Sequence, residues 1–197
     1  GGSDRVFHVL SGGRLALGAV SLRSGSAAAN EGGAVRTAGQ LSLRDAGVYD
    51  CAGGGIANDG GAVWLFNTTV SGHHGGYALS SRSLGALVME GGSISDNQGG
   101  GLLNATATAS LTGVTVARNA GGGVRSEGPN LTRLTVDRST IISNTATSGA
   151  GVFSQGVGAT TVISGTRISG NTATGAGGVG RLMATCASGT RFHSSAG

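Results

Sequence analysis

The basic residues of this chain lack variety and are scattered along it. There is no lysine, so all 13 basic residues are arginine. They stand singly rather than in runs, and the high isoelectric point follows from few charges of either sign rather than from a basic patch. This composition does not indicate binding to nucleic acid, and we expect no nucleic-acid partner.

Aromatic residues and long hydrophobic runs are also scarce. Aromatics make up 4% of the chain, so the core must be built from Val, Ile, Leu and Ala, which suits thin stacked layers better than a globular centre. No apolar run approaches the about 18 residues that a membrane-spanning helix needs. The chain does not open on a secretion signal. We expect no membrane span, and either a mature product or a segment of a longer chain.

Glycine, by contrast, is abundant and regularly placed. It contributes 41 residues against one proline, yet 38% of the chain is hydrophobic, which argues against disorder. The phrase "ISNTATSGAGVFSQ" at 142–155 returns as "ISGNTATGAGGVGR" at 168–181. Such repetition predicts a solenoid of stacked units.

The repeat is marked by two apolar residues five positions apart, in eight copies that follow one another at intervals of 22 to 27 residues. The pairs are Leu17/Leu22, Leu43/Val48, Leu65/Val70, Met89/Ile94, Leu111/Val116, Val136/Ile141, Ile163/Ile168 and Ala187/Phe192. A third apolar residue follows a glycine-rich stretch in most copies: Val35, Ile56, Leu79 or Ala78, Leu102, Val124, Val152 and Val179. A spacing of five is not a strand period, so we expect a bend or bulge between the two members of each pair.

A turn position follows each pair by three residues. It holds Gly25, Cys51, His73, Asn97, Asn119, Asn144, Asn171 and Ser195. Asn tolerates a left-handed backbone, and its amide can bond to the Asn of the next coil. We predict a structural ladder of Asn97, Asn119, Asn144 and Asn171 inside one domain, residues 1–197, of about eight coils.

These residues resemble a known coil pattern. Φ-x4-Φ-x2-N-x-A-x2-G-G-G-V is similar to the coil of right-handed parallel β-helix proteins of the pectate-lyase-like superfamily. The words "GGAV" at 32–35, "GGGI" at 53–56 and "FNTT" at 66–69 resemble the GGA(I/V) and FxxN words of polymorphic outer membrane protein repeats. The resemblance implies an all-β, right-handed parallel β-helix. It leaves function open among lyases, hydrolases, epimerases, adhesins and structural surface proteins.

Enzymes of that superfamily need residues that this chain largely lacks. Their lyases use a carboxylate cluster, and their hydrolases use paired Asp and an Arg-x-Lys word that a chain without lysine cannot contain. Our best catalytic hypothesis joins Asp50, His73, Asp96 and Arg118, with the two carboxylates about 10 Å apart across two coils. The competing interpretation, which we favour, is an Asp96–Arg118 ion pair, a solvated Asp50 and a ladder His73. We therefore expect no enzyme, no cofactor and no metal site.

The two cysteines, Cys51 and Cys186, fall in the second and eighth coils. Six coils at about 4.8 Å each separate them by nearly 30 Å, beyond the about 7 Å that a disulfide allows between Cα atoms. We expect a buried Cys51, and either a buried thiol or a bond to another chain at Cys186.

Two surface features suggest carbohydrate. Glycosylation sequons begin at Asn67, Asn104 and Asn130. The position before the second apolar residue reads Ser21, Gly47, Thr69, Ser93, Thr115, Thr140, Arg167 and Arg191. This column could bind sugar, carry O-linked glycans or order water, or it could simply hold good strand residues on an exposed face.

The sequence as a whole predicts a non-enzymatic extracellular or cell-surface protein with a structural or adhesive role, such as a rigid segment of a filament, wall or coat glycoprotein. The alternative is a polysaccharide lyase or glycoside hydrolase. The repeat already runs at Leu15 and continues to Phe192 without a polar cap. We therefore expect partner chains at the coil ends, through self-assembly or docking.

Overall fold

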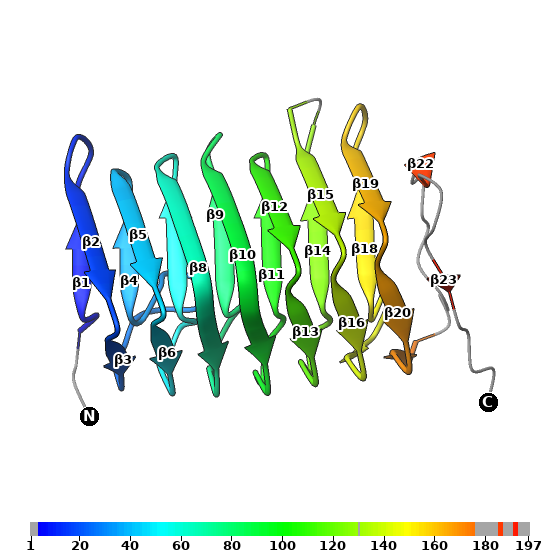
Figure 1. Ribbon diagram of the computed structural model, residues 1–197, viewed down its shortest axis with the longest axis horizontal. Coiled ribbons are helices and arrows are strands. Elements are labelled where there is room, and N and C mark those ends of the chain that lie inside the picture. The colour runs from blue at the N-terminus through cyan, green and yellow to red at the C-terminus, as the bar shows by residue number, and fades with distance from the viewer. Residues whose placement is uncertain (1–3, 130, 176–184, 187–190, 193–197) are drawn as a thin grey trace.

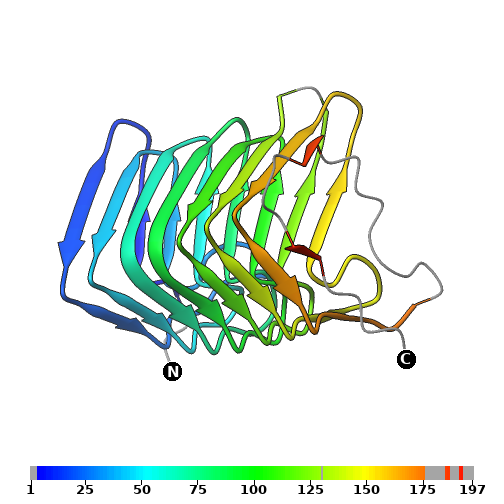
Figure 2. The ribbon, with the colours of Figure 1, turned by 45° about the vertical axis from the view of Figure 1, so that its right-hand side comes forward.

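The chain winds into a parallel β-solenoid whose coils stack along one axis (Figure 1). The computed structural model describes residues 4–129, 131–175, 185–186 and 191–192. The described residues include no helix that is long and apolar enough to cross a membrane. Viewed obliquely, each coil passes through a rear wall, an upper loop and a bent front wall (Figure 2).

Among the described residues, the rear wall is a seven-stranded sheet with one strand from each of seven successive turns of the solenoid. Its strands, in order, are β1 (Phe7–Val9), β4 (Val35–Thr37), β7 (Ile56–Asp59), β9 (Leu79–Arg82), β11 (Leu102–Ala105), β14 (Val124–Glu127) and β18 (Val152–Gln155). The third apolar residues from Val35 to Val152 lie here in register, and in the third coil that residue is Leu79 rather than Ala78. Val179 lies outside the described residues.

The front wall is a 14-stranded sheet made of two columns. The upper column contains β2 (Arg14–Gly18), β5 (Gln40–Arg44), β8 (Ala62–Ser71), β10 (Ala86–Ser95), β12 (Thr108–Thr112), β15 (Arg133–Asp137), β19 (Thr160–Ser164) and β22 (Thr185–Cys186). The lower column contains β3 (Ser21–Arg23), β6 (Gly47–Tyr49), the later halves of β8 and β10, β13 (Thr115–Ala117), β16 (Thr140–Ile142), β20 (Arg167–Ser169) and β23 (Arg191–Phe192). A two-stranded sheet pairs β17 (Thr145–Ala146) with β21 (Thr172–Ala173).

The bend between the two columns explains the spacing of five. The residue two places after the first apolar residue has a left-handed backbone in every coil from the first to the seventh, at Ala19, Asp45, Asn67, Gly91, Gly113, Arg138 and Gly165. One such residue turns the chain and lets the apolar residues on both sides face the interior. The predicted bend is confirmed.

The apolar pairs form continuous buried columns. Leu43, Leu65, Met89, Leu111 and Val136 are fully buried and in register, and so are most of their partners across the bend. The first member of the eighth pair was predicted one residue too late, because Cys186, not Ala187, pairs with Ile163. Phe192 pairs with Ile168 as expected, so six positions rather than five separate the two members of the last pair.

Candidate functional site

Of the four residues of the catalytic hypothesis, only Asp96 and Arg118 form a direct contact. His73 is fully buried in the interior turn column. Its Nδ1 accepts the Cys51 N–H at 3.1 Å, so its Nε2–H donates to the Val48 carbonyl at 3.1 Å. Burial lowers the pKa of this imidazole to about 4, against the opposing effect of its two backbone hydrogen bonds. The ring is thus neutral and structural.

The acidic members of that hypothesis are engaged elsewhere, on the outside of the coils. Asp96 forms a two-pronged ion pair with Arg118, with oxygen–nitrogen distances of 2.6 and 2.8 Å, and this bond lowers the pKa of Asp96. Asp50 lies 3.5 Å from Arg23. Among the described residues, no hydrogen bond or ion pair joins His73 to either carboxylate, and no three His, Cys, Asp or Glu side chains are grouped as metal ligands. The geometry therefore does not support the four-residue catalytic cluster.

The turn column instead forms one chain of hydrogen bonds. The Asn119 Oδ1 accepts from both the backbone N–H and the amide Nδ2 of Asn97, at 3.3 and 2.7 Å. Asn119 repeats both bonds toward Asn144, and Asn144 repeats them toward Asn171. At the N-terminal end of this chain of bonds, the His73 backbone N–H donates to the Asn97 Oδ1 at 3.0 Å. Each side chain thus stabilises the turn of the previous coil.

A second polar column, which the sequence reasoning missed, lies inside the rear wall. Thr37, Asn58, Ser81, Asn104 and Ser126 are fully buried and in register. The Asn104 amide donates to the Ser126 hydroxyl at 3.2 Å and to the Arg133 carbonyl at 3.0 Å. The signal was a small polar residue two positions after each third apolar residue.

This burial corrects one glycosylation prediction. Asn104 has no exposed surface, so its amide cannot carry a glycan in this fold. Asn67 is exposed, although its amide donates to Asp45 at 2.8 Å, and glycosylation there stays a prediction. Asn130 lies outside the described residues.

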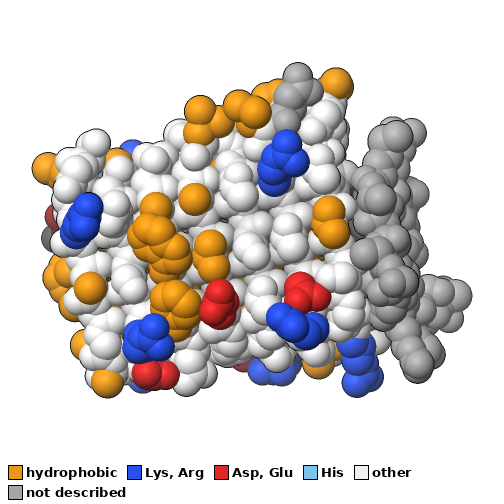
Figure 3. All heavy atoms as spheres, turned by 45° about the horizontal axis from the view of Figure 1, so that its top comes forward, with side chains coloured by type: hydrophobic (Ala, Val, Ile, Leu, Met, Phe, Trp, Pro, Cys, Tyr) orange, Lys and Arg blue, Asp and Glu red, His pale blue; other side chains and the backbone are white. Residues whose placement is uncertain are grey.

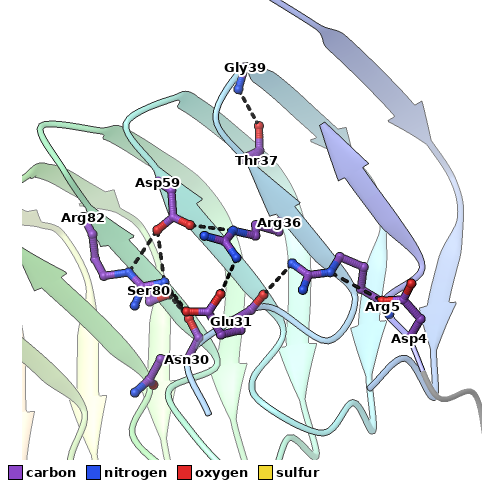
Figure 4. Close-up of polar contacts among 10 residues, drawn as sticks. All are labelled: Asp4, Arg5, Asn30, Glu31, Arg36, Thr37, Gly39, Asp59, Ser80 and Arg82. Carbon is purple, nitrogen blue, oxygen red and sulfur yellow. Dashed lines mark hydrogen bonds and ion pairs between the residues drawn. The ribbon is translucent and has the colours of Figure 1, made fainter. Parts of the chain in front are cut away.

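The first-coil loop, residues 24–34, crosses the outside of the rear wall and is held by charged side chains (Figure 4). Glu31 pairs with Arg36 and Arg82, and both arginines also pair with Asp59. The Asn30 side chain accepts the Tyr77 backbone N–H at 2.8 Å. We call this loop and its charged partners the ionic strap.

Cys51, in the turn column, is buried as predicted. Cys51 is a buried free thiol whose sulfur contacts the Tyr49 carbonyl at 3.1 Å, and burial raises its pKa. Cys186 lies in β22, and its side chain is outside the part that the structure describes.

One edge of the solenoid is unusually apolar. Leu10, Leu84, Leu131 and Val157 are 66%, 64%, 60% and 86% exposed. All four lie in the loops that join the rear wall to the upper front column, and hydrophobic side chains line that edge in Figure 3. None of the described residues in these seven connecting loops is charged. We call this row of loop tips the apolar edge.

The front wall presents two outward surfaces. On the lower column, the predicted Ser/Thr positions from Ser21 to Arg191 are in register from coil to coil. On the upper column, the half-buried side chains of Trp64, Phe66 and Val88 form a small hydrophobic patch (Figure 3). The sequence reasoning missed this patch, although the inward Val63 and Leu65 fix the outward direction of the residues between and after them.

Comparison with known proteins gives one positive result. No curated protein and no solved structure matches the chain. The family model described as "right handed beta helix region" matches residues 33–195, which is most of the chain and includes every coil after the first. With its stacked parallel strands and in-register apolar columns, the chain belongs to the right-handed β-helix family.

Proposed function

We propose that this β-helix is a non-enzymatic extracellular protein with a structural or adhesive role, a rigid segment of a surface filament, wall or coat glycoprotein. The observation that carries the proposal is the apolar edge. Isolated exposed leucines are ordinary, but a row of them along one uncharged edge marks an interaction surface.

The shape of the molecule supports a role as a spacer. Buried apolar columns run through the described coils, and strand pairing fixes each coil to the next. Buried amides add to this from the fourth coil to the seventh. A row of loop tips on such a frame keeps a constant spacing of about 4.8 Å per coil. A long straight contact surface suits adhesion to an extended partner better than it suits the enclosure of a small substrate.

The surface that the edge contacts can be identified by retention. We expect the purified chain to be retained on at least one of a panel of supports coated with polysaccharide, protein or lipid. The variant Leu84→Ser/Leu131→Ser/Val157→Ser should lose that retention by about tenfold or more, because each exposed side chain contributes apolar contact area. Thr115→Ala on the lower front column is the matched control and should keep it.

Cleavage of a polysaccharide by the purified chain would favour the alternative function, a polysaccharide lyase or glycoside hydrolase. The same preparations should release no reducing or unsaturated ends from acidic polysaccharides. Release that is abolished by Asp50→Asn or Asp96→Asn, with the fold intact, would overturn the non-enzymatic proposal. Retention unaffected by the triple edge variant would overturn the assignment of adhesion to the apolar edge.

A further inference from the structure

The upper front column carries a line of three side chains with an unusual order of charge. Arg44, Phe66 and Glu90 occupy the same outward position on β5, β8 and β10, three successive coils. The Arg44 guanidinium lies over the Phe66 ring, 4.7 Å from its centre. The line therefore reads positive, aromatic, negative along the axis of the solenoid.

Glu90 differs from the other acidic residues. Within the described residues, every other Asp and Glu either forms an ion pair or, at Asp45, accepts a hydrogen bond from a side chain. Glu90 is exposed and makes neither contact with any residue that the structure describes, and Arg44 pairs with no carboxylate in that part of the chain. The two charges lie about 10 Å apart with Phe66 between them, so they cannot pair with each other.

A two-fold axis would satisfy both charges at once. An axis that lies in the plane of the contact at Phe66, perpendicular to the solenoid axis, brings a second copy face to face with the first, with its solenoid running in the opposite direction. It places Arg44 of each copy opposite Glu90 of the other and packs the two Phe66 side chains together. Such an interface uses the same patch on both copies, as closed dimers do.

We propose that this face of the upper front column, centred on Arg44, Phe66 and Glu90, is the interface of an antiparallel dimer of this chain. A glycan fits the face less well. Stacking of a sugar needs an open ring face, and Arg44 already covers one face of Phe66. The Trp64 and Val88 side chains flank the line and add apolar area to a contact between two flat walls.

The dimer is expected to be weak. The face is flat, and its apolar centre is small beside the about 800 Å² per partner of a standard interface. Association should therefore be sought from about 10 μM to about 1 mM, where contacts of this size are populated.

The experiment is a charge exchange followed by sedimentation velocity across that range. The wild-type chain should form a discrete dimer. Arg44→Glu and Glu90→Arg should each weaken the dimer by about tenfold or more, because each places like charges opposite one another. The double variant Arg44→Glu/Glu90→Arg restores opposite charges across the axis and should recover dimerisation. Circular dichroism and melting of each variant control for folding.

Restoration by the double variant distinguishes this interface from contacts at the coil ends or at the apolar edge, which do not contain these side chains. Association that is equal in the wild type, both single variants and the double variant would overturn the proposal. A monomer at all concentrations would overturn it as well. If that monomer binds a neutral oligosaccharide with a change in Trp64 fluorescence that Trp64→Ala removes, the face is a glycan platform instead.

Discussion

The same turn of the solenoid is stabilised by different chemistry in the two halves of the molecule. From the fourth coil onward, Asn97, Asn119, Asn144 and Asn171 bond to one another through neutral amides. In the second and third coils the column contains Cys51 and His73, and the histidine ring is the side chain that connects the two neighbouring turns. Both arrangements fill the column, but only the one with His73 contains a group that can take up a proton as the pH falls.

The outside of the rear wall also differs in charge between the two halves. The first three coils are covered by the ionic strap, in which Glu31 and Asp59 bridge Arg36 and Arg82. The N-terminal half thus depends on titratable and charged groups at both its interior turn and its outer wall. We infer that pH and salt act mainly on this half, whereas the asparagine half responds chiefly to loss of its amides.

The largest expected effect is the loss of one ladder amide. Asn119→Ala removes the acceptor for the Asn97 N–H and leaves the Ile94 carbonyl without its side-chain donor, all in a fully buried turn. We expect a loss of about 3 kcal/mol in the free energy of unfolding. Thr115→Ala, exposed on the same coil, should change it by less than about 0.5 kcal/mol. Equal effects of the two changes in chemical denaturation would contradict the ladder.

The next effect is acid destabilisation through His73. Its pKa is about 4 in the folded chain and about 6.5 in the unfolded chain, so the unfolded chain takes up the proton first as the pH falls. The stability present above pH 6.5 is lost progressively as the pH falls, by about 3 kcal/mol at pH 4. His73→Asn should flatten this part of the stability–pH curve. An unchanged slope in the variant would assign the loss to other groups.

The smallest effect concerns the ionic strap. Glu31→Gln keeps the shape of the side chain but removes its charge from two arginines, and the pairs are partly exposed. We expect a loss of about 1 kcal/mol at low salt that shrinks as salt is added. Asp50→Asn, which removes the more exposed pair with Arg23, is the control and should give no resolvable change. A loss that does not depend on salt would show that the strap acts through hydrogen bonds rather than charge.

The fold could be predicted from the sequence because its periodic signal is geometric. In a parallel stack the same position of each coil meets the same neighbours, so the second apolar residues from Leu22 to Phe192 align as their spacing predicts. The prediction of Ala187 was wrong because it assumed that the two members of each pair are always five positions apart. One inserted residue was enough to move the register to Cys186.

The functional surfaces were harder to predict because they depend on contacts between distant residues or on loop geometry. Arg82 and Glu31 meet across 51 positions, which no local pattern indicates. Leu84 and Val157 lie at the tips of loops of different length, so no regular interval in the sequence identifies them. The sequon at Asn104 identifies a residue type that can carry a glycan but does not indicate whether the side chain is exposed. In the strand, the Asn104 side chain faces the interior and is buried.

Peptide-resolved hydrogen exchange at about pH 7 and about pH 5 tests most directly whether the two halves are held by different chemistry. After correction for intrinsic exchange, we expect protection to fall at the lower pH around Cys51 and His73, while the coils around Asn119 and Asn144 keep theirs. In His73→Asn the N-terminal loss should disappear. Loss of protection spread evenly over both halves, or a loss that persists in the variant, would contradict the account.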